Sequence, residues 1–130
     1  VRIYVICIGT NNLMAGTPSI LERITYLKRF IRARNATARI IFLGLFYRPG
    51  FEAKVSALNQ GISSMVRASD SKVHYAPWPE KVVKREHLMD DVHPNEFGWG
   101  LVMDRLMPVL DLLLNGPQPV SNPIAKGFPL

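Results

Sequence analysis

An acid and an imidazole stand three residues apart in Asp90-Asp91-Val92-His93-Pro94, just before the last apolar segment of the chain. A carboxylate at Asp90 can accept the Nδ1–H of His93 and leave Nε2 facing outward as a base. Such a pair supplies two members of a hydrolytic triad. The alternative is an Asx turn followed by a histidine that only faces solvent.

A second polar stretch, Gly9-Thr10-Asn11-Asn12, follows an apolar run at the start of the chain. A side-chain amide such as that of Asn11, fixed by a turn after a rigid strand, is a good oxyanion donor. Removing one such donor typically costs roughly 10²–10³ in rate. Asn11 and Asn12 are also typical of turns, and taken alone that is the simpler interpretation.

The elements that must position these residues alternate along the chain. Short β-branched and apolar runs predict strands at Val1–Ile8, Arg39–Leu45 and Lys72–Ala76. Apolar residues at helical spacing predict helices that Pro18, Glu52 and Asn95 begin and that end at about 35, 68 and 114. Thr17 is expected to cap the first helix, and Pro94 to occupy the first turn of the last one. Gly61 is expected to weaken the second helix by about 1 kcal/mol relative to Ala.

Crossover connections of this length predict a parallel sheet with right-handed connections. In such sheets, functional groups gather beyond the carboxyl ends of the strands. Three segments leave those ends: 9–12, Tyr47–Gly50 and the long connection 77–93. Asn11, Asp90 and His93 are therefore expected to meet on one rim.

Together these residues resemble the SGNH hydrolases, also called the GDSL-like esterases and lipases. The family's third block, Gly-x-Asn-Asp after a central strand, is similar to Gly9-Thr10-Asn11-Asn12, with Asn12 in place of the usual Asp. Its last block, Asp-x-x-His-Pro, matches Asp90 to Pro94. The stretch Phe42-Leu43-Gly44-Leu45-Phe46-Tyr47-Arg48-Pro49 looks like that of platelet-activating-factor acetylhydrolase-type members.

The resemblance spans about residues 1–114 and implies a three-layer α/β/α fold with a parallel, flavodoxin-like sheet. It makes residues 1–116 the C-terminal portion of such a domain, and 117–130 a Pro-rich extended tail. It implies the following roles: His93 as general base, Asp90 as its orienting partner, Asn11 as oxyanion donor, and Gly9, Asn12 and Arg48 as substrate-binding residues.

The family's nucleophile block, Gly-Asp-Ser, occurs nowhere in the 130 residues, and the Gly of its second block is missing too. The serines fall on predicted helices, on helix edges or in the tail, where none follows a strand at a sharp turn. They are Ser19, Ser56, Ser63, Ser64, Ser69, Ser71 and Ser121. A serine esterase is therefore expected only if the serine comes from an N-terminal segment or a companion chain.

The first residue, Val1, is not an initiator Met, and Val1–Ile8 already reads as a central strand. We therefore expect the chain to be cut from a longer product or to lack its first part. An apolar strand with a bare edge is an aggregation hazard. Val1–Ile8 is accordingly expected to pair with a strand from a companion chain or from a missing N-terminal segment.

The net charge of +6 is concentrated in residues 1–50, which hold eight Lys and Arg and one acid. A basic set on and just after the first helix could bind nucleic acid, anionic lipid or an acidic partner, although a solvated helix face is the more usual explanation. The set is Arg23, Lys28, Arg29, Arg32, Arg34 and Arg39. A catalytically inactive structural or interaction module within a larger assembly is the alternative to the esterase.

Composition sets the remaining limits. No apolar run approaches the length needed to span a bilayer, so a soluble protein is expected. Cys7 is alone, which fits a reducing compartment such as the cytoplasm, and a core thiol is its expected role. Cys7, His74 and His87 show no metal-ligand spacing, so neither a metal nor a cofactor is expected.

Overall fold

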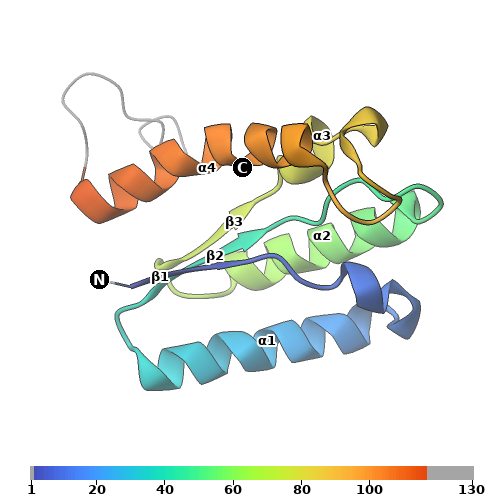
Figure 1. Cartoon of the computed structure of the whole chain (residues 1–130). Helices are drawn as coiled ribbons and strands as arrows, with labels where there is room; N and C mark the ends of the chain where they lie inside the picture. The colour runs from blue at the N-terminus through green and yellow to red at the C-terminus, as the bar shows by residue number, and fades with distance from the viewer. Residues whose placement is uncertain (1, 117–130) are drawn as a thin grey trace.

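The computed structural model describes residues 2–116, which form a parallel three-stranded sheet between two helical layers (Figure 1). The strands lie in the order of the sequence, β1 (Ile3–Ile6), β2 (Arg39–Leu43) and β3 (Val73–Ala76). In register, Ile6 of β1 is opposite Phe42 of β2, which is in turn opposite Tyr75 of β3. The predicted tail, 117–130, lies outside the residues described.

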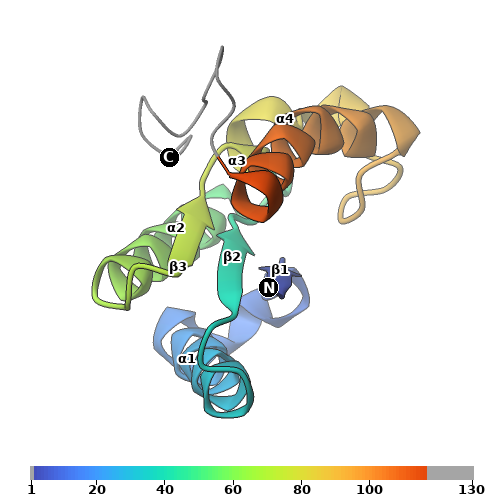
Figure 2. The same ribbon diagram turned by 90° about the vertical axis from the view of Figure 1, so that its left-hand side faces the viewer.

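The helices pack in pairs on opposite faces of the sheet, as the end-on view in Figure 2 shows. One face carries α1 (Thr17–Arg34) and α2 (Glu52–Arg67), and the other carries the short α3 (Pro79–Val82) and the long α4 (Glu96–Asn115). Two 3-10 turns, η1 (Thr10–Ala15) and η2 (Arg85–His87), complete the connections. The predicted three-layer α/β/α architecture is confirmed.

Side chains that alternate along β2 explain why the sheet has a core on each face. Ile40 and Phe42 point into the core made with α1 and α2, where Ile24 and Leu58 are buried. The neighbouring Ile41 and Leu43 point into the second core, made with Val102, Leu106 and Val109 of α4. A strand buried on both faces reads as a continuous apolar run, which is the signal that predicted β2.

Helix boundaries differ from the predictions mainly at the caps. Gly16, not Thr17, is the N-cap residue of α1. The last helix begins after Pro94, and Asn95 caps it by accepting a hydrogen bond from the backbone N–H of Gly98 at 2.9 Å. The predicted end of α4 at Gly116 is confirmed. The helix continues through Pro108.

The first strand differs most in burial from its prediction as a strand covered on both faces. Ile3, Tyr4 and Ile6 are half-buried, and 39% of Val5 is exposed. Within residues 2–116, β1 pairs on one side only, with β2. Its other edge therefore presents backbone N–H and C=O groups beside apolar side chains, an arrangement that folded proteins usually cover.

Candidate active site

The loop before α4 brings Asp90 and His93 into direct contact. Nδ1 of His93 lies 2.9 Å from Oδ2 and 3.2 Å from Oδ1 of Asp90. The backbone N–H groups of Val92 and His93 both donate to Oδ1 of Asp90 at 2.7 Å. The carboxylate thus closes an Asx-type turn and contacts the imidazole with the same group, so the turn and the Asp–His contact occur together.

These contacts keep Asp90 ionised. The hydrogen bond from the His93 side chain, followed by those from the backbone N–H groups of Val92 and His93, lowers the pKa of Asp90 to about 2. A carboxylate that is charged at every physiological pH fixes the proton of His93 on Nδ1. Nε2 is then the nitrogen left to accept a proton.

A cavity of about 210 Å³ joins this loop to the carboxyl end of β1. His93 and Asn11 both line it, although they come from opposite ends of the described chain. The expected meeting of these two residues on one rim is therefore observed. The walls are largely apolar and are formed by Cys7, Ile8, Thr10, Leu45, Phe46, Val92 and Trp99.

Glycine at position 9 is required by the turn that carries Asn11. Gly9 has φ of 117°, in the left-handed region where a side chain is strained. A Cβ there would also lie 2.9 Å from Cδ2 of Leu58 in the core. The carbonyl of Gly9 accepts from the backbone N–H of Asn12 at 3.0 Å, which begins η1. Gly9 and Asn12 line a smaller neighbouring cavity of about 160 Å³ rather than the one shared by Asn11 and His93.

Arg48 contacts the turn that carries Asn11. Its guanidinium donates to the backbone carbonyl of Thr10 and lies 4.3 Å from the centre of the Phe51 ring. It is not among the residues that line the cavity. The guanidinium of Arg48 is thus bound to the backbone next to Asn11. The resemblance to the SGNH hydrolases had implied a contact with substrate instead.

The cavity residues without a role in the sequence-based site include Cys7, Phe46 and Trp99. The rings of Phe46 and Trp99 meet edge to face, with centroids 5.4 Å apart. Cys7 is an exposed residue and not the expected core thiol, because β1 lies at the edge of the sheet. Although the residue as a whole is exposed, desolvation of the thiol by its neighbours raises its pKa to about 11.

No serine lies among the residues that line this cavity. Within the described range, six of the seven serines are on helices, on helix ends or between α2 and β3. Three His, Cys, Asp or Glu side chains do not come together anywhere in that range in a way that could hold a metal ion. The cavity therefore brings together the candidate base His93 and the candidate oxyanion donor Asn11, and the hydroxyl among its lining residues belongs to Thr10.

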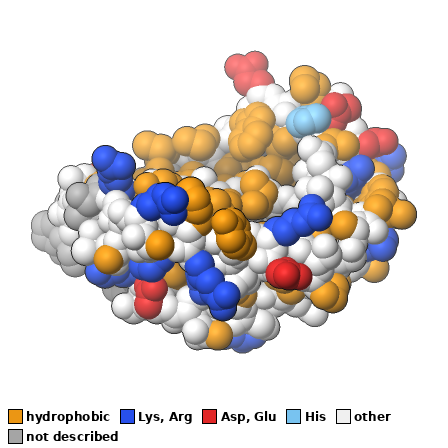
Figure 3. Space-filling model, turned by 90° about the horizontal axis from the view of Figure 1, so that it is seen from below, with side chains coloured by type: hydrophobic (Ala, Val, Ile, Leu, Met, Phe, Trp, Pro, Cys, Tyr) orange, Lys and Arg blue, Asp and Glu red, His pale blue; other side chains and the backbone are white. Residues whose placement is uncertain are grey.

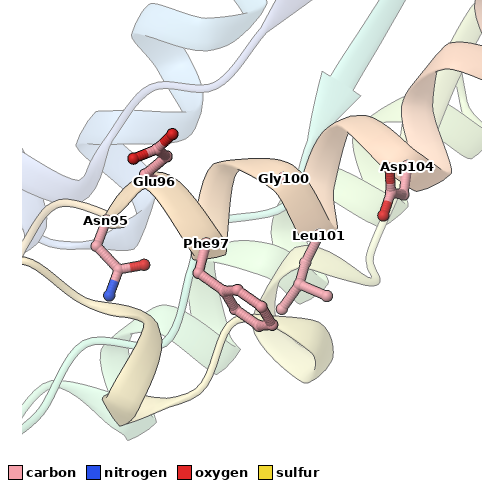
Figure 4. A pocket seen from close by; sticks show the side chains of 6 residues that line it. All are labelled: Asn95, Glu96, Phe97, Gly100, Leu101 and Asp104. Atoms are coloured by element: carbon pink, nitrogen blue, oxygen red, sulfur yellow. The ribbon is translucent and has the colours of Figure 1, made fainter.

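A second, more open pocket of about 550 Å³ runs along the first turns of α4 (Figure 4). It shares no lining residue with the cavity of His93. Phe97 and Leu101 project from the same flank of the helix. Asn95, Glu96, Gly100 and Asp104 complete the lining. The amide of Asn95 is already used in capping α4 and in donating to the carbonyl of Glu86.

The basic residues of α1 are largely engaged within the protein. Arg32 donates to the backbone carbonyls of Ala36 and Ala38 and pairs with Asp70 at 3.2 Å. Lys28 donates to Ser69 Oγ at 2.8 Å. The guanidinium carbon of Arg34 lies 3.5 Å from the centre of the Phe30 ring. These contacts tie α1 to the connection before β3 and leave fewer cations for an external polyanion.

The fold closely resembles that of a solved esterase. A carbohydrate esterase family 3 protein from Talaromyces cellulolyticus matches this chain with a TM-score of 0.79 at 23% sequence identity. The two proteins share a fold in which helices cover both faces of a parallel sheet. The match covers 90% of this chain and 60% of that one, so the chain spans less than two thirds of the esterase's length. No protein-family model and no curated protein matches the chain.

This likeness concerns the fold, because sequence identity is low. The finer resemblance to platelet-activating-factor acetylhydrolase-type members stays a prediction. Across residues 2–116, no helix combines the length and the apolar character needed to cross a membrane.

Proposed function

We propose that this chain carries the histidine, the aspartate and an oxyanion donor of a carboxylic ester hydrolase with a Ser-His-Asp mechanism. The serine would come from an N-terminal segment or a companion chain. The observation that carries the proposal is the Asp90–His93 contact of 2.9 Å at a cavity that His93 shares with Asn11. The similar fold of a protein described as a carbohydrate esterase supports ester chemistry.

The proposed reaction follows from which atoms can accept or donate a proton. Nε2 of His93 takes the proton of the serine hydroxyl while the serine oxygen attacks the acyl carbon. The carbonyl oxygen becomes an oxyanion, to which the side-chain amide of Asn11 donates. The imidazolium gives its proton to the leaving alcohol, and water then repeats the sequence on the acyl-enzyme. Asp90 stays ionised and stabilises the imidazolium in both halves of the reaction.

The proposed source of the serine is a strand that pairs with the free edge of β1. At the end of β1, Trp99 of α4 lines the same cavity as Cys7 and Ile8. From Trp99 on, the described part of α4 carries exposed apolar side chains at helical spacing on one flank. They are Trp99, Met103, Met107 and Leu114. Figure 3 shows hydrophobic side chains gathered over a hollowed part of the surface beside a histidine. A parallel strand placed there would cover this flank and end at the rim that holds His93.

The test is ester hydrolysis by the complete gene product on a short p-nitrophenyl ester. Activity should be lost in His93→Ala and kept in His87→Ala, because Nδ1 of His87 accepts from the backbone N–H of Lys84 outside the cavity. Activity that survives His93→Ala would exclude this mechanism. The 130-residue chain alone should be inactive.

The second candidate is a catalytically inactive module that keeps the fold inside a larger assembly. It is favoured by the cavity itself, whose lining within the described chain includes no serine. The parent reading frame separates the two candidates. A frame with no Gly-Asp-Ser upstream, and no partner protein that supplies a serine, would leave the module as the function.

Nucleic-acid association through α1 would show as binding that weakens steeply with salt.

A further inference from the structure

Asn59, in the middle of α2, is a polar side chain in the core, with 5% of its surface exposed. Its Oδ1 accepts from the backbone N–H of Leu45 at 2.8 Å. Its Nδ2 donates to Oε2 of Glu80 at 2.8 Å and to the carbonyl of Leu45 at 3.4 Å. One side chain thus joins α2, the segment after β2 and the start of α3.

The position of Asn59 follows from where the sheet ends. The last bond between β2 and β3 runs from the N–H of Gly44 to the carbonyl of Ala76 at 2.8 Å. Leu45 is the next residue, and only 1% of it is exposed. Backbone groups buried there need a partner, because an unmade hydrogen bond in the interior is costly. The amide of Asn59 takes the place of a further strand.

Glu80 fixes which way this amide points. An ionised carboxylate only accepts hydrogen bonds, so it selects the NH₂ end of Asn59 and turns Oδ1 toward Leu45. The charge of Glu80 also reaches the interior. Together with burial, which has the larger effect, it raises the pKa of Tyr75 to about 12. Asn59 and Glu80 therefore hold the segment that follows β2 through hydrogen bonds of a fixed donor–acceptor sense.

That segment builds the candidate site. Leu45 and Phe46 line the cavity that holds Asn11 and His93. Arg48, a few residues later, donates to the carbonyl of Thr10, next to Asn11. We infer that Asn59 and Glu80 are positioning residues, which hold 45–48 so that the cavity wall and the turn of Asn11 keep their relative places. For catalysis, this inference rests on the proposed ester hydrolysis.

The test exchanges the donor and the acceptor of the pair. Asn59→Asp keeps an oxygen that can accept from the N–H of Leu45, but it removes the donor and places a second carboxylate against Glu80, and the repulsion should pull residue 59 away from Leu45. Asn59→Asp with Glu80→Gln restores a donor–acceptor pair of the opposite sense. Gln60→Glu, an amide-to-acid change on the exposed face of the same helix, is the matched control. In the chain of 130 residues, amide exchange at Leu45 should be faster by about tenfold or more in Asn59→Asp and near wild type in the double variant and in Gln60→Glu.

Two further readouts separate positioning from general stability. In the complete protein, at a temperature where all variants are folded, Asn59→Asp should lower kcat for a p-nitrophenyl ester by roughly tenfold with little change in KM, and the double variant should recover it. In the isolated chain, the amide NMR signals of Thr10 and Asn11 should shift in Asn59→Asp and return in the double variant. If Asn59→Asp does not fold, Glu80→Leu removes the orienting acceptor instead, and the same measurements are made on that variant.

The outcomes are distinguishable. Unchanged Leu45 exchange in a folded Asn59→Asp, unmoved signals at Thr10 and Asn11, or a double variant no better than the single one would each overturn the inference. A complete wild-type protein with no esterase activity would overturn the proposed function. The exchange and NMR readouts of the isolated chain would then decide the positioning role by themselves.

Discussion

The guanidinium of Arg48 donates a hydrogen bond to the backbone carbonyl of Thr10, across 38 positions of sequence. The contact joins the segment after β2 to the turn after β1, and Asn11 is the next residue of that turn. Stacking on Phe51 holds the guanidinium plane at 4.3 Å from the ring centre. A residue predicted from sequence to touch substrate therefore supports the backbone beside the candidate oxyanion donor.

Arg48→Lys should weaken this support although the charge is kept. Lysine cannot reproduce the planar stacked geometry, so we expect the free energy of unfolding to fall by about 1 kcal/mol. In the complete protein, kcat should fall more than KM rises, because Asn11 is displaced and no substrate contact is lost. Urea denaturation and ester kinetics measure the two effects. Arg105→Lys, on the exposed face of α4, is the control and should change neither.

Asp90→Asn should reduce kcat of the complete protein by roughly 10³–10⁴, the size of effect seen when a triad aspartate loses its charge. An amide can present its NH₂ to Nδ1 of His93 and so move the proton to Nε2, which then cannot act as a base. Asp91→Asn changes the adjacent exposed acid and should leave the rate within about twofold of wild type. Equal rates for the two variants would remove Asp90 from the mechanism.

The loop of Asp90 should lose stability at acid pH. The pKa of Asp90 is lowered to about 2, below the usual value of a carboxyl group in an unfolded chain. Its contribution to stability is therefore fully present above about pH 4 and is lost as the pH falls toward 2. Amide NMR signals of Val92 and His93, which donate to this carboxylate, should titrate with a midpoint near pH 2. A midpoint at the ordinary carboxyl value of about 4 would show that the contacts do not form in solution.

Much of the fold follows from the apolar pattern. The β2 strand was predictable because Ile40, Ile41, Phe42 and Leu43 form an uninterrupted apolar run, as expected for a strand buried on both faces. The helical spacing of apolar residues likewise predicted α2, whose buried face includes Val55, Leu58 and Ile62. The order of strand and helix then left a parallel sheet as the simplest topology.

Details that depend on long-range contacts were not predictable. Asn59 lies at a helical position with nothing in the sequence to show that it bonds Leu45 and Glu80, because these contacts join separate elements. Cys7 reads as a core residue only if β1 is covered on both sides, and it lines a cavity because β1 is at the sheet edge. Periodicity detects a buried face, but it does not detect which buried group needs a polar partner.

Gly61 gives the sharpest case, because its place in the sequence alone predicts a weak point in α2. In the structure, a Cβ at Gly61 would clash with the side chain of Leu21, so the glycine allows α1 and α2 to pack closely. Gly100, also inside a helix, faces open space, since a Cβ added there would have no neighbouring atom within 4 Å. Packing therefore requires a glycine at position 61 but not at position 100. Only the contact between the helices distinguishes the two positions.

Alanine at these two positions should change stability in opposite directions. Gly100→Ala should stabilise the protein by about 1 kcal/mol through helix propensity. Gly61→Ala should instead destabilise it by about 1–3 kcal/mol through overpacking. Urea denaturation of the two variants measures both changes. The double variant Gly61→Ala with Leu21→Ala should regain only part of the stability that Gly61→Ala loses, because removing the Leu21 side chain leaves a cavity. A stabilised Gly61→Ala would show that helix propensity outweighs the contact between α1 and α2.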